Sequence, residues 1–250
     1  MFRDLTPDLD NDALEPDMLL DVPFVPTDKG VIKEMLKLAE VGRKDMVYDL
    51  GSGEGCILIA AARYRGARGV GIEIDPLRIA DAVEFAADAY VENQLDFVED
   101  NIFDADISEA TVVTLYLLPT VNVQLRPKLL NELRPGTRVI SHAFDMGDWQ
   151  ADEKLELSSV TIYKWVIPAQ IAGAWEWEGY DGKAYRVELQ QKYQEVSGSA
   201  WVDGEVAELK NAVLSGNSLW LEIQPGAASS PDSFTLTFEK NELQSVEHDN

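Results

Sequence analysis

Short apolar runs and amphipathic stretches alternate along the first two thirds of the chain. Apolar runs at 46–50, 70–74, 95–98, 111–117 and 138–143 predict buried strands. Stretches with helical periodicity occur at 28–40, at 56–64, from Pro76 onward and at 121–133. Repeated strand–helix–strand units predict a doubly wound parallel sheet with right-handed crossovers. Segments 153–157 and 160–167 are expected to complete it as an antiparallel pair, which gives a seven-stranded sheet.

The spacing of apolar residues also predicts which helix faces are buried. The helix at 28–40 is expected to have Thr27 as its N-cap. Its expected buried residues are Val31, Ile32, Met35, Leu36 and Leu38. The helix that begins at Pro76 is expected to bury Ile79, Val83, Ala86 and Tyr90.

After Pro168 the helical periodicity ends, and apolar residues alternate with polar ones. This alternation, at 185–193, 219–223 and 234–238, predicts antiparallel strands with one face in water. We therefore expect an acidic flexible arm at 1–21, an α/β domain with a Rossmann-like sheet at 22–169, and a small antiparallel all-β domain at 170–250. Aromatic residues from Trp165 onward are expected to form the core of the last domain, with a ligand groove as the alternative.

Composition restricts the partners that the chain is expected to bind. The formal net charge of −24 argues against broad binding to the phosphate backbone of nucleic acid, which depends on lysine and arginine. No apolar run approaches the roughly 20 residues of a membrane span, and the first residues do not resemble a secretory signal. The single cysteine, Cys56, is consistent with a reducing compartment, so a cytoplasmic protein without nucleic-acid or membrane partners is expected. Too few histidines and cysteines are present for a zinc-type cluster, and no metal site is expected.

A glycine-rich turn follows the first predicted strand. It reads G-x-G-x-G at 51–55, whereas turns that present a pyrophosphate to a helix read G-x-G-x-x-G. Glu54 lies inside the turn and would repel a pyrophosphate. The spacing and this charge disfavour a dinucleotide cofactor.

Acidic and amide side chains lie at the ends of the first three predicted strands. Asp49 precedes the turn, where a carboxylate can meet an ammonium group. Glu73 closes the second strand and could accept hydrogen bonds from ribose hydroxyls. Asp100 and Asn101 close the third strand, where an adenine amino group could be received. Any one of these could be a solvated strand end, but their position on adjacent strand tips predicts one shared site.

The residues at 47–55 and 71–75 resemble class I S-adenosylmethionine-dependent methyltransferases. A narrower similarity extends over roughly 22–167. The segments 23–27, 108–118, 125–129 and 135–142 resemble archaeal broad-specificity protein-lysine methyltransferases and their mitochondrial lysine methyltransferase relatives.

This resemblance implies S-adenosylmethionine as the cofactor and a lysine on a protein as the methyl acceptor. The cofactor-binding residues that it implies are Thr27, Asp49, Gly51, Ser52, Gly53, Glu73, Ile74, Asn101, Ile102, Leu115 and Tyr116. Asp49 and the turn would hold the methionine part, Glu73 the ribose, and Asn101 with Ile102 the adenine. Many family members carry Asp at the position of Asn101. The segment after 170 has no counterpart in the minimal archaeal enzyme, so its role is not implied.

No catalytic residue is assigned from the sequence, because methyl transfer to an amine does not require a dedicated base. An apolar channel beside a sulfonium lowers the pKa of a lysine amine by desolvation and like charge. Tyr116 would either orient the amine or pack on the adenosine. His142 would be either a base or a strand-end histidine with a backbone partner.

Other functions compatible with these residues are a small-molecule N- or O-methyltransferase and a binding module that holds the cofactor without turnover. A dinucleotide-dependent oxidoreductase ranks last.

Overall fold

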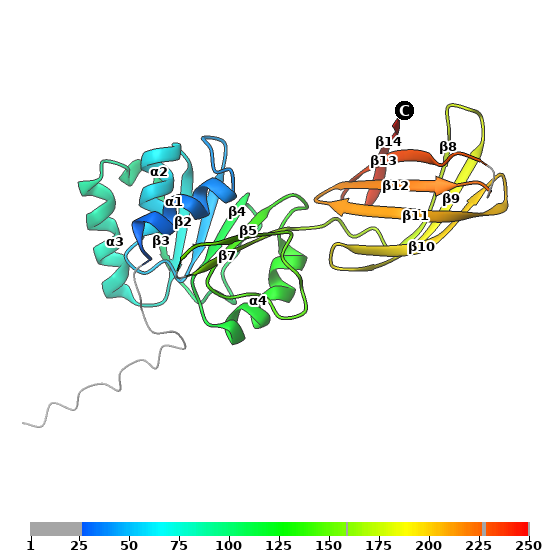
Figure 1. Ribbon diagram of the computed structural model, residues 1–250. Coiled ribbons are helices and arrows are strands. Elements are labelled where there is room, and N and C mark those ends of the chain that lie inside the picture. Colours follow the sequence, from blue (N-terminus) through cyan, green and yellow to red (C-terminus); the bar gives the residue numbers. More distant parts are fainter. Residues whose placement is uncertain (1–26, 159, 227–228, 250) are drawn as a thin grey trace, which may run out of the picture.

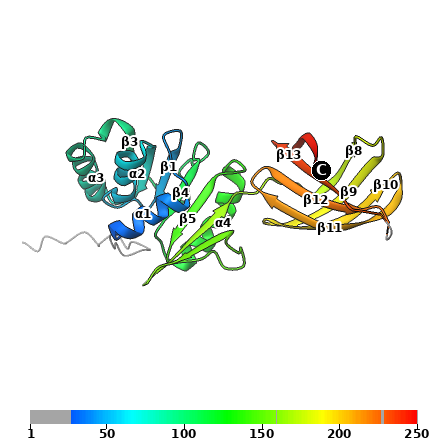
Figure 2. The ribbon, with the colours of Figure 1, turned by 45° about the horizontal axis from the view of Figure 1, so that its top comes forward.

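The computed structural model describes residues 27–158, 160–226 and 229–249, which form two seven-stranded sheets. The two sheets follow one another along the length of the molecule, and both ribbon views show them as separate bodies (Figures 1 and 2). The acidic arm expected at 1–21 and the segment 22–26 lie outside the described residues.

The first sheet has the strand order β3-β2-β1-β4-β5-β7-β6. Strands β1 to β5 pair in parallel, whereas β7 pairs antiparallel with both β5 and β6. The predicted mixed seven-stranded sheet is therefore confirmed. Its elements are α1 (Lys29–Leu38), β1 (Met46–Leu50), α2 (Cys56–Arg65), β2 (Arg68–Glu73), α3 (Pro76–Asp88), the 3-10 turn η1 (Glu92–Gln94), β3 (Leu95–Glu99), β4 (Val112–Leu115), α4 (Pro119–Glu132), β5 (Arg138–His142), β6 (Glu153–Glu156) and β7 (Thr161–Val166).

Helices cover both faces of this sheet and enclose two apolar cores. Helices α1 and α2 bury residues such as Met35 and Leu58 against one face, and α4 buries Leu125 and Leu129 against the other. The expected N-cap Thr27 is wrong by one residue, because the Asp28 side chain accepts the Gly30 N–H at 2.7 Å.

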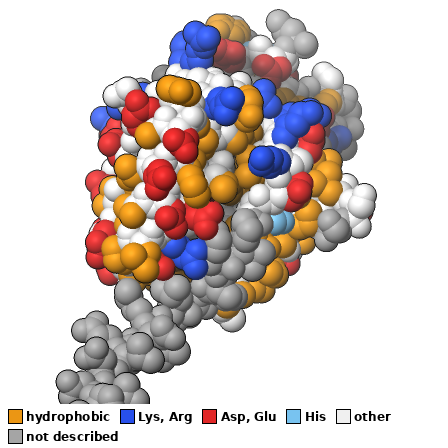
Figure 3. Space-filling view, turned by 90° about the vertical axis from the view of Figure 1, so that its left-hand side faces the viewer, with side chains coloured by type: hydrophobic (Ala, Val, Ile, Leu, Met, Phe, Trp, Pro, Cys, Tyr) orange, Lys and Arg blue, Asp and Glu red, His pale blue; other side chains and the backbone are white. Residues whose placement is uncertain are grey.

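The buried face predicted for α3 is partly wrong. The helix buries Ala82 and Ala86, whereas Val83 is 52% exposed and Tyr90 is 90% exposed. Helix α3 packs on β2 and β3 at the edge of the sheet, and only its small alanines fit against the strands. Its larger apolar side chains face outward, among acidic ones, on the end of the molecule seen in Figure 3.

The second sheet is an antiparallel meander in which each strand pairs with its neighbour in the chain. Its strands are β8 (Gly173–Glu178), β9 (Ala184–Lys192), β10 (Glu195–Val202), β11 (Glu205–Ser215), β12 (Ser218–Gln224), β13 (Asp232–Glu239) and β14 (Glu242–Asp249). The predicted alternation is confirmed, since Tyr185, Val187, Leu219, Leu221 and Phe234 are among the buried residues of one core. The division into domains at residue 170 stays a prediction.

Two aromatic residues assigned to the second core pack in the first. Trp165 lies in β7 and is fully buried, with its ring centroid 5.8 Å from that of Trp149. Tyr193 lies in the turn after β9 with φ 56° and contacts Trp149 at the same centroid distance. The β7 strand and the β9–β10 turn bring these rings to the first sheet. The alternation of apolar and polar residues along the chain does not indicate this placement.

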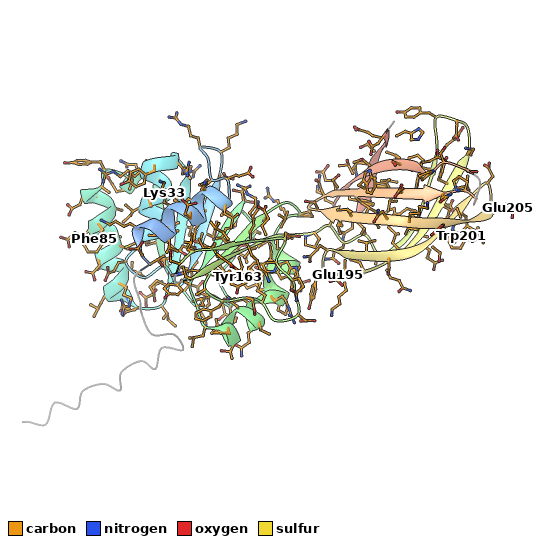
Figure 4. All side chains as sticks on the ribbon, in the orientation of Figure 1. Lys33, Phe85, Tyr163, Glu195, Trp201 and Glu205 are labelled. Carbon is orange, nitrogen blue, oxygen red and sulfur yellow. The ribbon has the colours of Figure 1, made fainter. Side chains whose placement is uncertain are left out.

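The β9–β10 turn connects the two sheets through polar contacts. The Trp149 indole donates to Gln194 at 2.8 Å, and the Gln194 amide donates to the Gln150 carbonyl at 2.7 Å. Asp148 forms ion pairs with Arg126 of α4 and Lys192 of β9. Figure 4 shows Glu195 on this side of the second sheet and Trp201 and Glu205 at its far end.

Candidate functional site

The order of the strands reverses between β1 and β4. The chain winds from β1 outward to β3 and then returns to β4 on the other side of β1. Ligands of open α/β sheets bind at such a reversal, outside the carboxyl ends of the strands. The glycine turn after β1 lies at this point.

The turn at 51–55 requires glycine for both backbone and packing reasons. Gly51, Gly53 and Gly55 have φ values of 79°, 50° and 75°, where side chains other than glycine are strained. A Cβ on Gly55 would lie 2.7 Å from the Phe97 ring. The Gly51 and Ser52 amides donate to the Ile72 carbonyl at 2.9 and 3.0 Å, which fixes the turn to the end of β2.

Glu73 holds this turn from the end of β2. Its Oε2 accepts the Gly53 N–H at 2.8 Å, and its Oε1 accepts the N–H groups of Ile74 at 2.8 Å and Asp75 at 3.1 Å. A carboxylate has about four acceptor positions, so a further donor such as a ribose hydroxyl can still be accommodated. Glu73 is 8% exposed, and beside it Ile74 presents an apolar side chain that is 40% exposed.

Asp49 is a buried carboxylate on the neighbouring strand. It is 3% exposed, and its Oδ1 accepts a 2.7 Å hydrogen bond from the Thr114 hydroxyl. Burial raises the pKa of Asp49 to about 7; the Thr114 hydrogen bond opposes this rise and the charge of Glu73 adds to it. In the part of the chain that the structure describes, neither Asp49 nor Glu73 forms an ion pair with lysine or arginine. Two buried acids of this kind favour a cationic ligand.

The adenine residues implied by the resemblance lie at the tip of β3. The Asp100 amide donates to the Glu73 carbonyl at 3.0 Å, which keeps this tip beside β2. Asn101 is exposed, and its side-chain oxygen accepts the Phe103 N–H at 3.0 Å. Ile102 is half-buried against the second core.

Thr27 precedes the N-cap Asp28, and Lys29 is the first residue of α1. Helix α1 packs against α2. Burial, Glu54 and Asp49 raise the pKa of Cys56 at the beginning of α2, whereas Lys29 lowers it. Thr27 is half-buried.

Leu115 and Tyr116 differ in what they can contact. Leu115 is fully buried in the second core. Tyr116 is half-buried, and its ring centroid lies 3.8 Å from that of His142 at the end of β5.

Sequence reasoning missed three buried polar residues at this edge. Thr114 bonds Asp49, and the Asn122 amide donates to the Ser141 hydroxyl at 3.1 Å and to the Phe144 carbonyl at 3.2 Å. All three side chains are fully buried. The sequence does contain a clue to Asn122, because it lies among the apolar residues of the buried face of α4. A buried polar side chain at such a position needs hydrogen-bond partners.

The described residues contain no group of three or more His, Cys, Asp or Glu side chains that could hold a metal ion. Among the described helices, none has the length and apolarity needed to cross a membrane.

Comparison with known proteins identifies similar chains. Residues 49–153 match the family model of the ANTKMT methyltransferase domain. A protein-lysine N-methyltransferase of Saccharolobus islandicus is 44% identical over 151 residues, which are 58% of this chain and 94% of that protein. An adenine nucleotide translocase lysine N-methyltransferase of Mus musculus is 30% identical over 131 residues, which are 52% of this chain and 57% of that protein.

A solved structure is also similar to this chain. It is described as an RNA methyltransferase from Salinibacter ruber in complex with S-adenosyl-L-homocysteine, and it is 55% identical with a TM-score of 0.58. The similarity covers 59% of this chain and 96% of that one.

Proposed function

Since this chain belongs to the protein-lysine N-methyltransferase family, we propose that it transfers a methyl group from S-adenosylmethionine to the ε-amino group of a lysine in a protein. The observation that carries the proposal is the pair of buried acids, Asp49 and Glu73, beside a glycine turn at the topological reversal of the sheet. S-adenosylmethionine has an ammonium group, a sulfonium and ribose hydroxyls, which match two acids that form no ion pair with a lysine or arginine among the described residues.

We assign the parts of the cofactor to residues by this match and by the family resemblance. Asp49 pairs with the ammonium group, and the backbone of Gly51, Ser52 and Gly53 lies along the methionine part. Glu73 accepts the ribose hydroxyls, and Ile74 provides an apolar contact beside them.

Four further residues complete the proposed site. Asn101 and Ile102 hold the adenine, and Thr27 closes the methionine end from the start of α1. Leu115 contributes its backbone to the strand edge, because its side chain is buried elsewhere.

The chemical demand on the protein is alignment, because the cofactor supplies a methyl group already activated by a sulfonium. Neutralising a lysine amine with an ordinary pKa near 10.4 at pH 7 costs about 4–5 kcal/mol. Removal of the amine from water and a nearby positive sulfonium lower this cost by desolvation and like charge. Tyr116 lies where β4 ends and lines the path of the acceptor.

An RNA acceptor is the competing hypothesis, because the Salinibacter ruber structure is described as an RNA methyltransferase. The net charge of −24 disfavours it, since RNA binding requires positive charge along the phosphate backbone. The same charge attracts lysine-rich protein surfaces.

Incubation of the purified protein with methyl-labelled S-adenosylmethionine and a cell extract tests the proposal. The extract is then separated into protein, RNA and small-molecule fractions. We expect label in the protein fraction, and ribonuclease treatment beforehand should leave it there. Label confined to RNA or to small molecules would refute the protein acceptor, and absence of transfer despite cofactor binding would indicate a binding module.

A further inference from the structure

His142 lies on the face of the sheet that carries Asp49 and Thr114. Asp49 is the register partner of Thr114, and Thr114 is the register partner of Ile140. Side chains alternate along a strand, so His142, two residues after Ile140, lies on that same face and nearer the carboxyl edge. Its position is thus next to the end of the site where the methionine part is proposed to lie.

The imidazole is held in place but has an unpaired nitrogen. His142 is 7% exposed, its ring centroid lies 3.8 Å from that of Tyr116, and the two rings are tilted by 37°. Its Nδ1 is fully buried without a hydrogen-bond partner among the described residues. A strand-end histidine with a structural role would satisfy this atom from the backbone, so the expected structural explanation does not account for His142.

The backbone after His142 is also strained. Ala143 has a φ of 71°, a left-handed conformation that alanine rarely adopts, and its amide donates to the Thr161 carbonyl at 2.9 Å. Backbone strain of this kind concentrates at functional sites. The turn it produces ends β5 at the histidine.

Burial lowers the pKa of His142, so its imidazole is neutral at pH 7. No charged group contributes to this shift in the described part of the chain. Tyr116 is the titratable group in ring contact with it. The elements packed on β5 are β4, β7 and α1. Strand β4 carries no charged side chain, β7 carries Lys164 with its partner Glu153, and α1 carries Lys29, Lys33, Glu34 and Lys37 after its N-cap Asp28. Asp49 and Glu73 lie further along the same sheet, on β1 and β2.

We infer that His142 receives a proton from the acceptor lysine. Its neutral imidazole also accepts a hydrogen bond from an N–H of the amine, and this bond orients the lone pair of the amine nitrogen. This inference rests on the proposed function. The ε-ammonium group gives one proton to the neutral imidazole. The freed lone pair forms the new N–C bond while the C–S bond breaks and its electron pair stays on sulfur, which becomes a thioether. The imidazolium then returns its proton to water. Because the imidazole is uncharged before this step, it adds no repulsion to the sulfonium.

Two measurements test the inference, one of which does not depend on turnover. The chain has two histidines, and His248 lies in β14 of the second sheet, so NMR titration gives two assignable imidazole signals. S-adenosylmethionine carries a positive sulfur and S-adenosylhomocysteine does not. The pKa of His142 should therefore be lower in the S-adenosylmethionine complex, whereas His248 should titrate identically in both. Equal His142 values in the two complexes would overturn the inference.

The second measurement is the pH profile of H142Q, with H248Q as the matched control. With His142 as proton acceptor, the reacting state pairs a neutral imidazole with a protonated amine, so log(kcat/KM) should rise with a slope of one below the pKa of His142 and level off above it. Without the imidazole only the neutral fraction of the amine reacts, and the slope of one continues up to the pKa of the amine. H142Q should lose about 10²-fold or more in rate and show a slope of one throughout, while its affinity for S-adenosylhomocysteine stays unchanged. H248Q should match the wild type.

A wild-type rate and profile in H142Q would overturn the role of His142 and leave the proposed function intact. Failure of the wild-type protein to bind either cofactor by calorimetry would instead refute the proposed function. If H142Q does not fold, the NMR comparison on the wild-type chain decides.

Discussion

Asp49→Asn should stabilise the cofactor-free protein at alkaline pH while weakening cofactor binding. The pKa of Asp49 rises from 3.8 to about 7 in the fold, chiefly because the carboxyl group is buried. A shift of about three units corresponds to ~4 kcal/mol. Since the folded pKa lies above the unfolded one, the protonated form contributes stability that is fully present below about pH 4 and is lost as the pH rises through about 7.

Asparagine keeps the shape of Asp49 and can still accept the 2.7 Å hydrogen bond from Thr114, but it does not ionise. The free energy of unfolding of the wild type should therefore fall by ~4 kcal/mol relative to Asp49→Asn between pH 4 and pH 8. Urea unfolding of both cofactor-free proteins, followed by tryptophan fluorescence, measures this difference. Other titrating groups are common to both proteins and cancel in the comparison.

Cofactor binding should reverse the order of the two proteins. An ammonium group beside Asp49 stabilises its carboxylate, so the wild type should bind S-adenosylhomocysteine more tightly than Asp49→Asn by about 1.5–3 kcal/mol at pH 8. If the free energies of unfolding of the two proteins change with pH in the same way, Asp49 is not a buried carboxylate that ionises near pH 7. Equal affinities would refute its contact with the cofactor.

Three other changes test neighbouring parts of the account. Glu73→Ala should weaken the binding of S-adenosylhomocysteine by about 1–3 kcal/mol, measured by calorimetry. Glu73→Gln retains one acceptor oxygen and should lose less binding free energy. Wild-type affinity in Glu73→Ala would contradict the assignment of Glu73 to the ribose. Gly55→Ala should lower the melting temperature more than Gly136→Ala, because both sites have positive φ but only Gly55 faces a ring, Phe97, at 2.7 Å; equal shifts would exclude the steric explanation. A chain ending at Ala169 should still bind S-adenosylhomocysteine, with a lower melting temperature because Trp149 loses its bond to Gln194; a truncated chain that cannot fold would place both sheets in one domain.

The strand–helix pattern and the strand-tip residues could be predicted because they depend on local sequence. The run before Gly51 and the acid at Glu73 belong to one β-α-β unit, and parallel strands bring their ends to one edge whatever the rest of the fold does. The alternation in the second sheet is equally local, since it follows from one face being buried.

The remaining features depend on contacts between distant segments. Val83 and Tyr90 have helical spacing but are exposed, because α3 lies at the edge of the sheet and only alanines meet it. The pairing of Asp49 with Thr114 joins residues 65 positions apart, and the contact of Tyr116 with His142 joins two strand ends. Neither contact is encoded in a local pattern.

The most direct test of the central claim is identification of the methylated atom. Methyl-labelled S-adenosylmethionine is incubated with the protein and a lysine-rich acceptor protein between pH 7 and pH 9, and the product is hydrolysed to amino acids. The same acceptor with acetylated lysines is the matched control. We predict label in ε-N-methyllysine at every pH in this range, absent from the control. Label in nucleosides or small metabolites, with the acceptor protein unlabelled at every pH, would contradict the account.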